Sequence, residues 1–259
     1  PDYQTVDSAA VNAEVQSLAA EHKGFSRWLD RNVRDQKQQG YASITLSLKP
    51  AGVAPGDVTD RQLDIIADLA DRFSFGEIRT THNQNIVLAD VHKSTLFELW
   101  QLAKASGLAT PNIGTINDMI CCPGGDYCSL ANAKSIPVAE AIQRKFDDLD
   151  YVYDLGDLEL NISGCMNACG HHHIGHIGIL GVDKKGEEWY QIQLGGSANK
   201  NAALGKVLGR SLSRDAVVDS IEKLLDVYVE NRLDQESFLG TYQRIGLDKF
   251  KERVYAPTS

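Results

Sequence analysis

Five cysteines fall within residues 121–169, and the rest of the 259-residue chain contains none. Cysteines that only fill a core would be scattered along the chain. A secreted protein stabilised by disulfides would usually be smaller, and its cysteines would be distributed more evenly along the sequence. The clustering therefore predicts that the chemistry of the chain lies in this window. The five are Cys121, Cys122, Cys128, Cys165 and Cys169.

Four of these cysteines form two closely spaced pairs, Cys122-x5-Cys128 and Cys165-x3-Cys169. Four thiolates on two loops suit a tetrahedral zinc ion or a four-iron cluster. Zinc sites usually separate the members of a pair by two to four residues, so the wider first pair favours the iron cluster. Zinc and reduced thiols buried in a core stay open as alternatives at this point.

Glycines flank both pairs, which permits close backbone approach and positive φ angles around a metal centre. These glycines are Gly124, Gly125, Gly164 and Gly170. The fifth cysteine, Cys121, has no partner in this pattern. We interpret it as a small buried hydrophobe beside a ligand.

Composition limits the kinds of partner. Twenty-six basic and thirty-five acidic residues give a net charge of −9. This charge disfavours a broad surface for nucleic acid or for an anionic membrane. No apolar run approaches ~20 residues, so no membrane span is expected. The polar first residues predict no export signal, and reduced thiolates need a reducing interior, so we expect a cytoplasmic protein.

The first part of the chain reads as helices followed by alternating strands and helices. Apolar residues recur at helical spacing over residues 1–37, and residues 41–48 alternate as a half-buried strand does. Thr59 with Gln62 fits a capping box that opens a helix. Two strands and a helix are expected next, over residues 77–81, 85–91 and 94–107. The order β-α-β-β-α is half of a ferredoxin-like unit.

The sequence becomes rich in glycine and cysteine after Pro111-Asn112, and this change in composition predicts a domain boundary there. A helix is expected over residues 129–146, and a helical tail is expected to run to Phe250. The other elements expected in this part are a strand over residues 158–162, a hairpin of 174–182 and 189–194, and a helix over 213–231.

The cysteine motif resembles that of a known family. Cys122-x5-Cys128 followed by Ser163-Gly-Cys-Met-Asn-Ala-Cys-Gly170 is similar to the siroheme and four-iron-cluster motif of the nitrite and sulfite reductases. The resemblance covers nearly the whole chain and matches the C-terminal half of such hemoproteins. Further stretches that look like the family are Asn32-Val33, Gln36-Lys37-Gln38, Gly40-Tyr41, Arg79-Thr-Thr-His-Asn-Gln-Asn85 and Leu194-Gly-Gly196.

The resemblance implies an α+β chain in three parts. Residues 1–37 would be an N-terminal helical segment, residues 38–110 a ferredoxin-like half domain, and residues 111–259 a mixed α/β domain that binds siroheme and a 4Fe-4S cluster. Cys122, Cys128, Cys165 and Cys169 would hold the cluster. Cys169 would also bridge it to the siroheme iron, and Asn167 would face the macrocycle.

Other candidate siroheme contacts rest on chemistry. Alternate residues of a strand share a face, so Arg79 and Thr81, with Gln84 in the following turn, could clamp the carboxylates of siroheme. Gly195 and Gly196 could let the backbone approach the ring. A solvated strand charge at Arg79 and a plain turn at the glycine pair are the alternatives.

Four histidines, at positions 171–173 and 176, invite a metal interpretation. Three consecutive side chains cannot all face one ion, so we expect packing or hydrogen bonding to metal ligands instead. Lys134, expected on the helix after Cys128, is interpreted as a surface lysine.

The resemblance implies an oxidoreductase that takes electrons from a flavoprotein or a ferredoxin. Sulfite reduction to sulfide by six electrons is the preferred reaction, and nitrite reduction to ammonia is the alternative. The Lys and Arg residues around substrate would come from an N-terminal half of the hemoprotein, so residues 1–259 alone are expected to be inactive. A cofactor-free or zinc-binding structural module is the alternative from another class.

Overall fold

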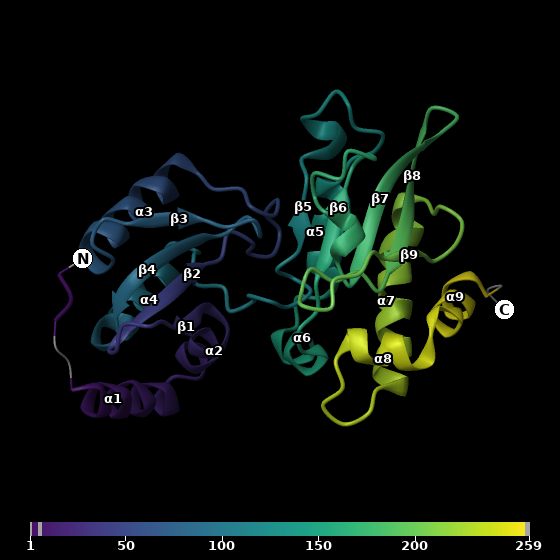
Figure 1. Cartoon of the computed structure of the whole chain (residues 1–259). Coiled ribbons are helices and arrows are strands. Elements are labelled where there is room, and N and C mark those ends of the chain that lie inside the picture. The colour runs from purple at the N-terminus through teal and green to yellow at the C-terminus, as the bar shows by residue number, and fades with distance from the viewer. Residues whose placement is uncertain (1, 5–6, 257–259) are drawn as a thin grey trace. The chain divides into compact units, whose positions relative to one another are not determined.

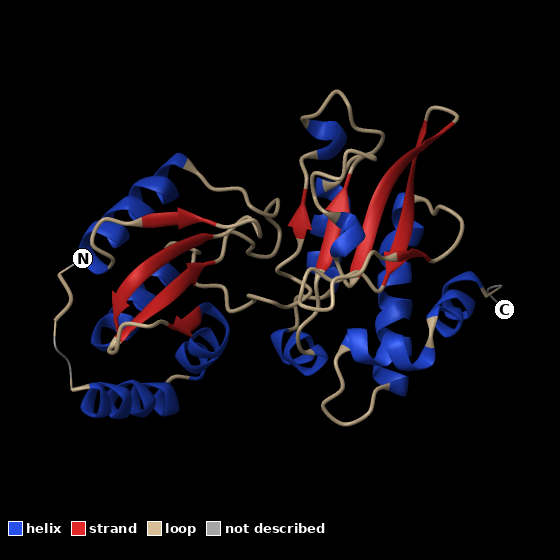
Figure 2. Cartoon of the chain, viewed as in Figure 1, coloured by secondary structure: helices blue, strands red, loops and turns tan. Residues whose placement is uncertain are grey.

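The computed structural model describes residues 2–4 and 7–256, and the chain folds as two compact units (Figure 1). Unit 1 consists of Pro1–Pro50 and Gly56–Ile113. Unit 2 consists of Ala51–Pro55 and Gly114–Ser259. Each unit has its own sheet (Figure 2) and its own hydrophobic core.

Unit 1 is built on a four-stranded antiparallel sheet in the order β1-β2-β4-β3. Its strands are β1 (Val33–Asp35), β2 (Tyr41–Leu46), β3 (Ile78–Thr80) and β4 (Ile86–His92). Its helices are α1 (Ser8–Glu21), α2 (Lys23–Asn32), α3 (Asp60–Phe73) and α4 (Leu96–Ala105), with a short 3-10 turn, η1 (Lys93–Thr95), before α4. The expected order β-α-β-β-α is confirmed from β2 to α4.

Local sequence explains where these elements begin and which face they bury. Ala42, Ile44 and Leu46 of β2 are fully buried, as the alternation predicts. The predicted capping box is present, because the Thr59 hydroxyl accepts the Gln62 N–H and the Gln62 side chain accepts the Thr59 N–H. Aromatic residues of α2, among them Trp28, join the same core.

Unit 2 is built on a five-stranded mixed sheet in the order β5-β6-β7-β8-β9. β5, β6 and β7 are parallel, and β7, β8 and β9 are antiparallel. The strands are β5 (Ile120–Cys121), β6 (Leu160–Ser163), β7 (Ile177–Lys184), β8 (Glu187–Leu194) and β9 (Lys206–Val207). The helices are α5 (Ile136–Lys145), α6 (Leu149–Leu155), α7 (Arg214–Asn231), α8 (Phe238–Ile245) and α9 (Leu247–Tyr255).

The long helix and the hairpin of unit 2 agree with the predictions. α7 packs against α5, α9 and β8 and supplies much of the core. No helix within residues 2–4 and 7–256 is long and apolar enough to cross a membrane.

The helix predicted over residues 129–146 is wrong at its start. α5 begins only at Ile136, with Ser135 at its N-cap and Pro137 in its first turn. Residues 129–135 form a loop instead, because the N–H groups of Asn132 and Ala133 donate to Gly164 O and therefore cannot enter a helix ladder. Lys134 consequently lies in this loop and not on a helix. The short elements β1, β5, β9 and α6 were not predicted.

Candidate metal centre

Two neighbouring parallel strands bring the cysteine pairs together. Cys121 of β5 lies opposite Ile162 of β6, so both strands run into their cysteine segments at the same edge of the sheet. The Cys122 N–H donates to Ile162 O at 3.1 Å. The Gly164 N–H donates to Cys122 Sγ at 3.0 Å. The segment before the second pair therefore touches a sulfur of the first.

The first pair is closed by a tight turn. Gly124–Asp126 form a 3-10 turn, η2, and the Cys128 N–H donates to Gly124 O at 2.9 Å. Lys134 makes a 2.8 Å ion pair with Asp126, the last residue of this turn. The hydrogen bond and negative charge of Asp126 raise the pKa of Lys134. Lys134 thus contacts the loop that joins Cys122 and Cys128.

Close backbone contacts hold the two cysteine segments in place. Gly164 O accepts from the N–H groups of Asn132 and Ala133, at 2.8 and 3.1 Å. A Cβ on Gly164 would lie 2.7 Å from Ala133 O, and one on Gly170 would lie 1.9 Å from Ile162 O. Neither site can take a side chain without moving backbone, which explains why glycines flank the pairs.

The second pair lies on a compact loop after β6. The Ala168 N–H donates to Cys165 O, and Ala168 has a positive φ of 57°. The Gly170 N–H donates to Ser163 Oγ at 3.1 Å and fixes the end of the loop to β6. Cys165 is buried, whereas Cys169 is exposed.

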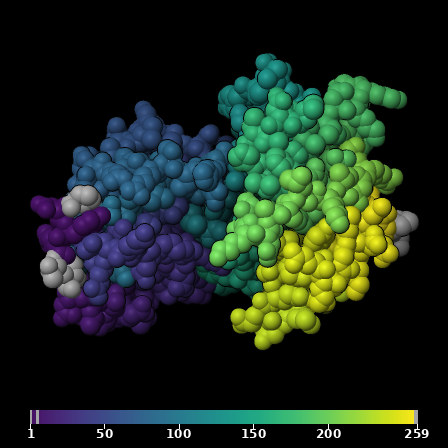
Figure 3. Space-filling view, viewed as in Figure 1, coloured from purple at the N-terminus to yellow at the C-terminus, as the bar shows by residue number. Residues whose placement is uncertain are grey.

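Exposed side chains surround the cysteine loops, which reach the surface of unit 2 in teal and green (Figure 3). Asn167 is exposed between Cys165 and Cys169. Three apolar side chains beside the cysteines are also strongly exposed: Tyr127 at 81%, Leu130 at 69% and Met166 at 83%. The four paired cysteines range from buried Cys165 to exposed Cys169, and apolar exposed residues beside them would suit an inorganic cluster next to an apolar group.

The arrangement of donors can be tested against the two metal interpretations. Among the described residues, no three His, Cys, Asp or Glu side chains lie close enough to hold one metal ion. A four-iron cluster is larger than a single ion and holds its thiolates further apart, and Cys₄ is its usual ligand set. Two loops that each carry two cysteines supply this number of thiolates.

The fifth cysteine has a different environment. The side chain of Cys121 is part of the unit 2 core, and it is 3% exposed. Its Sγ donates to Cys122 O at 3.3 Å. This environment agrees with a packing role.

Two of the four histidines, His172 and His176, are buried within unit 2, whereas His171 is exposed. His172 is 5% exposed, and burial, aided by the charge of His173, lowers its pKa to about 4. Burial also lowers the pKa of His176, whose Nδ1 accepts the Glu159 N–H at 3.2 Å. Both rings are therefore neutral near pH 7.

Arg79, Thr81 and Gln84 lie around the β3–β4 turn of unit 1. β3 ends at Thr80, one residue before Thr81, so the strand predicted over residues 77–81 is shorter than expected. Arg79 Nε donates to the Glu77 carboxylate at 2.6 Å. The Thr81 hydroxyl donates to Asn85 O and accepts the Asn85 N–H within the turn. Gln84 lies in the turn, as expected, with a positive φ of 55°.

Packing within unit 2 requires glycine at both positions of the pair after β8, Gly195 and Gly196. A Cβ on Gly195 would lie 2.1 Å from the Tyr242 ring, and one on Gly196 would lie 2.5 Å from Gly175 O. Both glycines are thus required inside unit 2, whether or not a cofactor approaches them.

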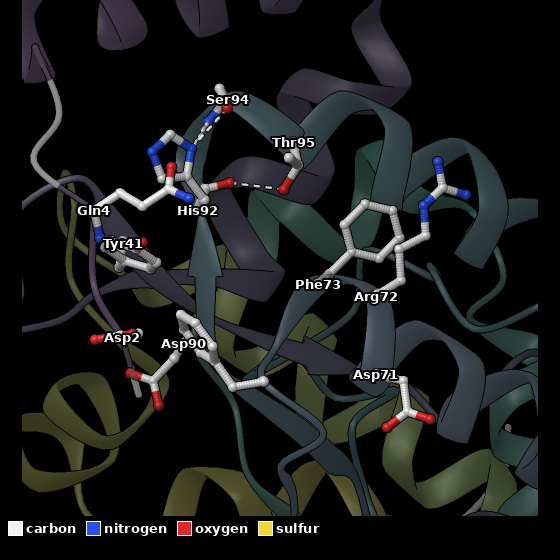
Figure 4. A pocket seen from close by; sticks show the side chains of 11 residues that line it. Asp2, Gln4, Tyr41, Asp71, Arg72, Phe73, Asp90, His92, Ser94 and Thr95 are labelled. Atoms are coloured by element: carbon white, nitrogen blue, oxygen red, sulfur yellow. Dashed lines mark hydrogen bonds between the residues drawn. The ribbon is translucent and has the colours of Figure 1, made fainter.

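Unit 1 contains a cavity of about 330 Å³ lined by both polar and aromatic residues (Figure 4). His92 Nδ1 and Ser94 Oγ share a 2.6 Å hydrogen bond at its rim, and the Thr95 hydroxyl donates to His92 O. Its lining holds no cysteine, so it is a feature separate from the metal centre.

Two residues that support the cysteine loops were missed by the sequence analysis. Tyr190 of β8 donates its hydroxyl to Lys134 O at 2.8 Å, and burial raises its pKa. Ser163 anchors Gly170, as described above. The Tyr190 contact joins residues 56 positions apart, so no local pattern could reveal it.

Comparison with known families agrees with this geometry. Residues 114–259 match the nitrite and sulphite reductase 4Fe-4S domain, and residues 34–106 match the nitrite/sulfite reductase ferredoxin-like half domain. These two domains define the fold class of the chain as α+β, a ferredoxin-like half domain followed by a 4Fe-4S domain. The chain belongs to the nitrite and sulphite reductase family.

The chain is similar both to proteins named sulfite reductase and to proteins named nitrite reductase. Sulfite reductase [ferredoxin] 2 of Mycolicibacterium paratuberculosis is 28% identical over 77% of this chain and 38% of its own length. The ferredoxin–nitrite reductase of Synechococcus elongatus is 28% identical over 86% of this chain and 43% of its own length. The chain thus spans about two fifths of these relatives.

Solved structures show the same fold. The NirA protein of Mycobacterium tuberculosis superposes with a TM-score of 0.69 at 25% identity, over 85% of this chain and 41% of that one. Dissimilatory sulfite reductase I superposes with a TM-score of 0.68 at 13% identity, over 100% of this chain and 83% of that one. The second likeness concerns the fold alone.

Proposed function

We propose that this chain is the cofactor-binding half of a sulfite reductase, with Cys122, Cys128, Cys165 and Cys169 as ligands of a 4Fe-4S cluster. The observation that carries this proposal is the 3.0 Å hydrogen bond from Gly164 N to Cys122 Sγ, which joins the two pairs within a 4Fe-4S family domain. The residues of the chain hold and orient the metal centre.

Siroheme is proposed as the second cofactor. When bound, the two cofactors supply the electron relay and the iron at which the oxyanion is reduced. Cys169 is the proposed bridge between them, supported by its exposure next to the buried Cys165. Asn167 would face the macrocycle, and Met166 and Tyr127 would cover apolar ring surface.

The chain does not carry the whole active site in this proposal. Its net charge of −9 opposes an anionic substrate and a cofactor with many carboxylates. An N-terminal half would supply the missing Lys and Arg residues, in keeping with the 38% of the relative that the chain covers. We therefore propose that residues 1–259 alone are inactive.

Arg79, Thr81, Gln84, Gly195 and Gly196 remain proposed siroheme contacts. To act as a clamp, Arg79 would have to exchange its Glu77 partner for a cofactor carboxylate.

Sulfite is the proposed substrate and nitrite the alternative. A ferredoxin is the proposed donor, because both named relatives use one, and a flavoprotein is the alternative. A reducing, cytoplasmic compartment suits four thiolates that must stay reduced. The ratio of kcat/KM for sulfite and nitrite, measured on the protein that contains both halves, decides the substrate.

An absorption spectrum tests the cofactor assignment. Siroheme adds a Soret band and a red band, a 4Fe-4S cluster alone gives a broad brown shoulder, and zinc gives neither. Cys169→Ser should uncouple the two cofactors in the complete protein, which changes both spectra and reduction behaviour. Spectra identical to the parent would refute the bridge, and tight zinc binding without iron would refute the redox function.

A further inference from the structure

Ser135 occupies an unusual position next to the metal centre. It is fully buried and is the N-cap residue of α5, yet its side chain makes no capping hydrogen bond. Its backbone is αR (φ −93°, ψ −42°), whereas capping serines usually adopt extended angles. The hydroxyl lies 3.5 Å from Cys122 Sγ instead.

The neighbouring glycines make room for this hydroxyl between the two cysteine segments. A Cβ on Gly124 would lie 2.7 Å from Ser135 Oγ, and one on Gly164 would lie 3.1 Å from it. The preceding residue is fixed as well, because Tyr190 donates to Lys134 O. Ser135 therefore has little freedom to turn elsewhere.

The direction of the hydrogen bond follows from the chemistry of the ligand. A cysteine binds a metal as its thiolate, which carries no proton. When Cys122 is a ligand, the serine hydroxyl must be the donor. Cys122 Sγ then accepts two hydrogen bonds, from Ser135 Oγ and Gly164 N, while the other three ligand sulfurs accept none from the residues described.

We propose that Ser135 is a positioning residue that donates to the Cys122 thiolate and thereby raises the reduction potential of the cluster. Hydrogen bonds to cluster sulfurs are one of the determinants of this potential, since they stabilise the more negative, reduced state. This inference rests on the proposed cluster function and adds to it which ligand is tuned and by which side chain.

The test uses the full chain, reconstituted anaerobically with iron and sulfide. Ser135→Ala removes only the hydroxyl, and no cap is lost with it. We expect the one-electron reduction equilibrium to fall by up to about tenfold, a shift of about 59 mV to more negative potential. Ser135→Thr keeps a hydroxyl and should return the potential toward the parent value.

Ser213→Ala is the matched control. Ser213 caps α7 through the Ala216 N–H, so its loss should lower the thermal midpoint and leave the potential unchanged. Proton ENDOR on the reduced parent cluster gives a second readout, in which Ser135→Ala should remove one exchangeable coupled proton.

The outcomes separate the inference from the function on which it rests. A cluster that forms in Ser135→Ala with the parent potential and the parent ENDOR spectrum would overturn the role of Ser135 alone. Failure of the parent chain to bind a four-iron cluster would overturn the proposed function and this inference with it.

Discussion

The two units hold their candidate cofactor-binding residues in different ways. In unit 2, Cys122 Sγ accepts a hydrogen bond from Gly164, which lies 42 positions later in the chain. In unit 1, the side-chain hydrogen bonds described for Arg79 and Thr81 reach only two and four positions, to Glu77 and Asn85. The cysteine loops are fixed by contacts between segments far apart in the sequence. The β3–β4 turn is also held from elsewhere in unit 1, because Leu48 and Lys49 donate to it, but these bonds end on Asn83 and Asn85 and not on Arg79 or Thr81.

This difference indicates how each region would respond to a ligand or a mutation. Close backbone contacts around Gly164 and Gly170 restrict the conformation of the cysteine loops. The Arg79–Glu77 pair is exposed, and exposed pairs exchange partners at little cost. Unit 2 should therefore be preorganised for its cofactor, while Arg79 should adapt.

Gly170→Ala should have the largest effect on stability. The new methyl group would lie 1.9 Å from Ile162 O in β6, so the free energy of unfolding should fall by about 3 kcal/mol or more. Gly186→Ala is the control, since its φ of +84° is strained but nothing lies within 4 Å. It should cost only about 1–2 kcal/mol. If urea unfolding showed equal losses of unfolding free energy in Gly170→Ala and Gly186→Ala, this would contradict the claim that backbone contacts fix the loop at Gly170.

Burial of His172 should make unit 2 sensitive to acid. The folded pKa of about 4 lies below the ordinary 6.5, so the unfolded state binds more protons between these values. Stability is complete above pH 6.5 and should fall by about 2–3 kcal/mol as the pH approaches 4. His172→Leu should flatten this part of the stability–pH curve. An unchanged slope in the variant would show that the ring is not buried neutral.

Thr59→Ala should have a smaller effect, confined to unit 1. Loss of the hydroxyl that accepts the Gln62 N–H should cost about 1 kcal/mol. Hydrogen exchange should show the loss in α3, and iron uptake should equal that of the parent. Reduced iron uptake would show that the metal centre depends on the helix cap of the other unit.

Arg79→Ala should change stability least. Its ion pair with Glu77 is exposed, so the free energy of unfolding should change by less than about 0.5 kcal/mol. The complete protein should nevertheless retain less siroheme, because a cation for its carboxylates is lost. Glu77→Ala frees the same arginine and should retain siroheme fully. Equal siroheme content in both variants would remove Arg79 from the proposed clamp.

Regular elements could be predicted from the sequence because their signals are local. The alternation in β2 and the capping box at Thr59 are read over a few residues, and both are present. The start of α5 also had a local signal, since Ser135 followed by Pro137 is typical of a helix start. The prediction of a helix from residue 129 overlooked it.

The architecture of the metal centre could be predicted only in part. The spacing of Cys122, Cys128, Cys165 and Cys169 indicates a four-thiolate ligand set, and a family domain supports this choice. The supporting contacts of Ser135 and Tyr190 depend on which strands become neighbours in the sheet. Such contacts carry no signal in a short window of sequence.

The central claim is that four of the five cysteines hold a 4Fe-4S cluster, and adjacent cysteines provide its most direct test. Iron and sulfide are counted per chain after anaerobic reconstitution of the parent, Cys122→Ala and Cys121→Ala. We predict four iron and four sulfide ions in the parent and in Cys121→Ala, whose sulfur belongs to the core, and loss of the intact cluster in Cys122→Ala. Loss of the cluster in Cys121→Ala with retention in Cys122→Ala would contradict the ligand assignment.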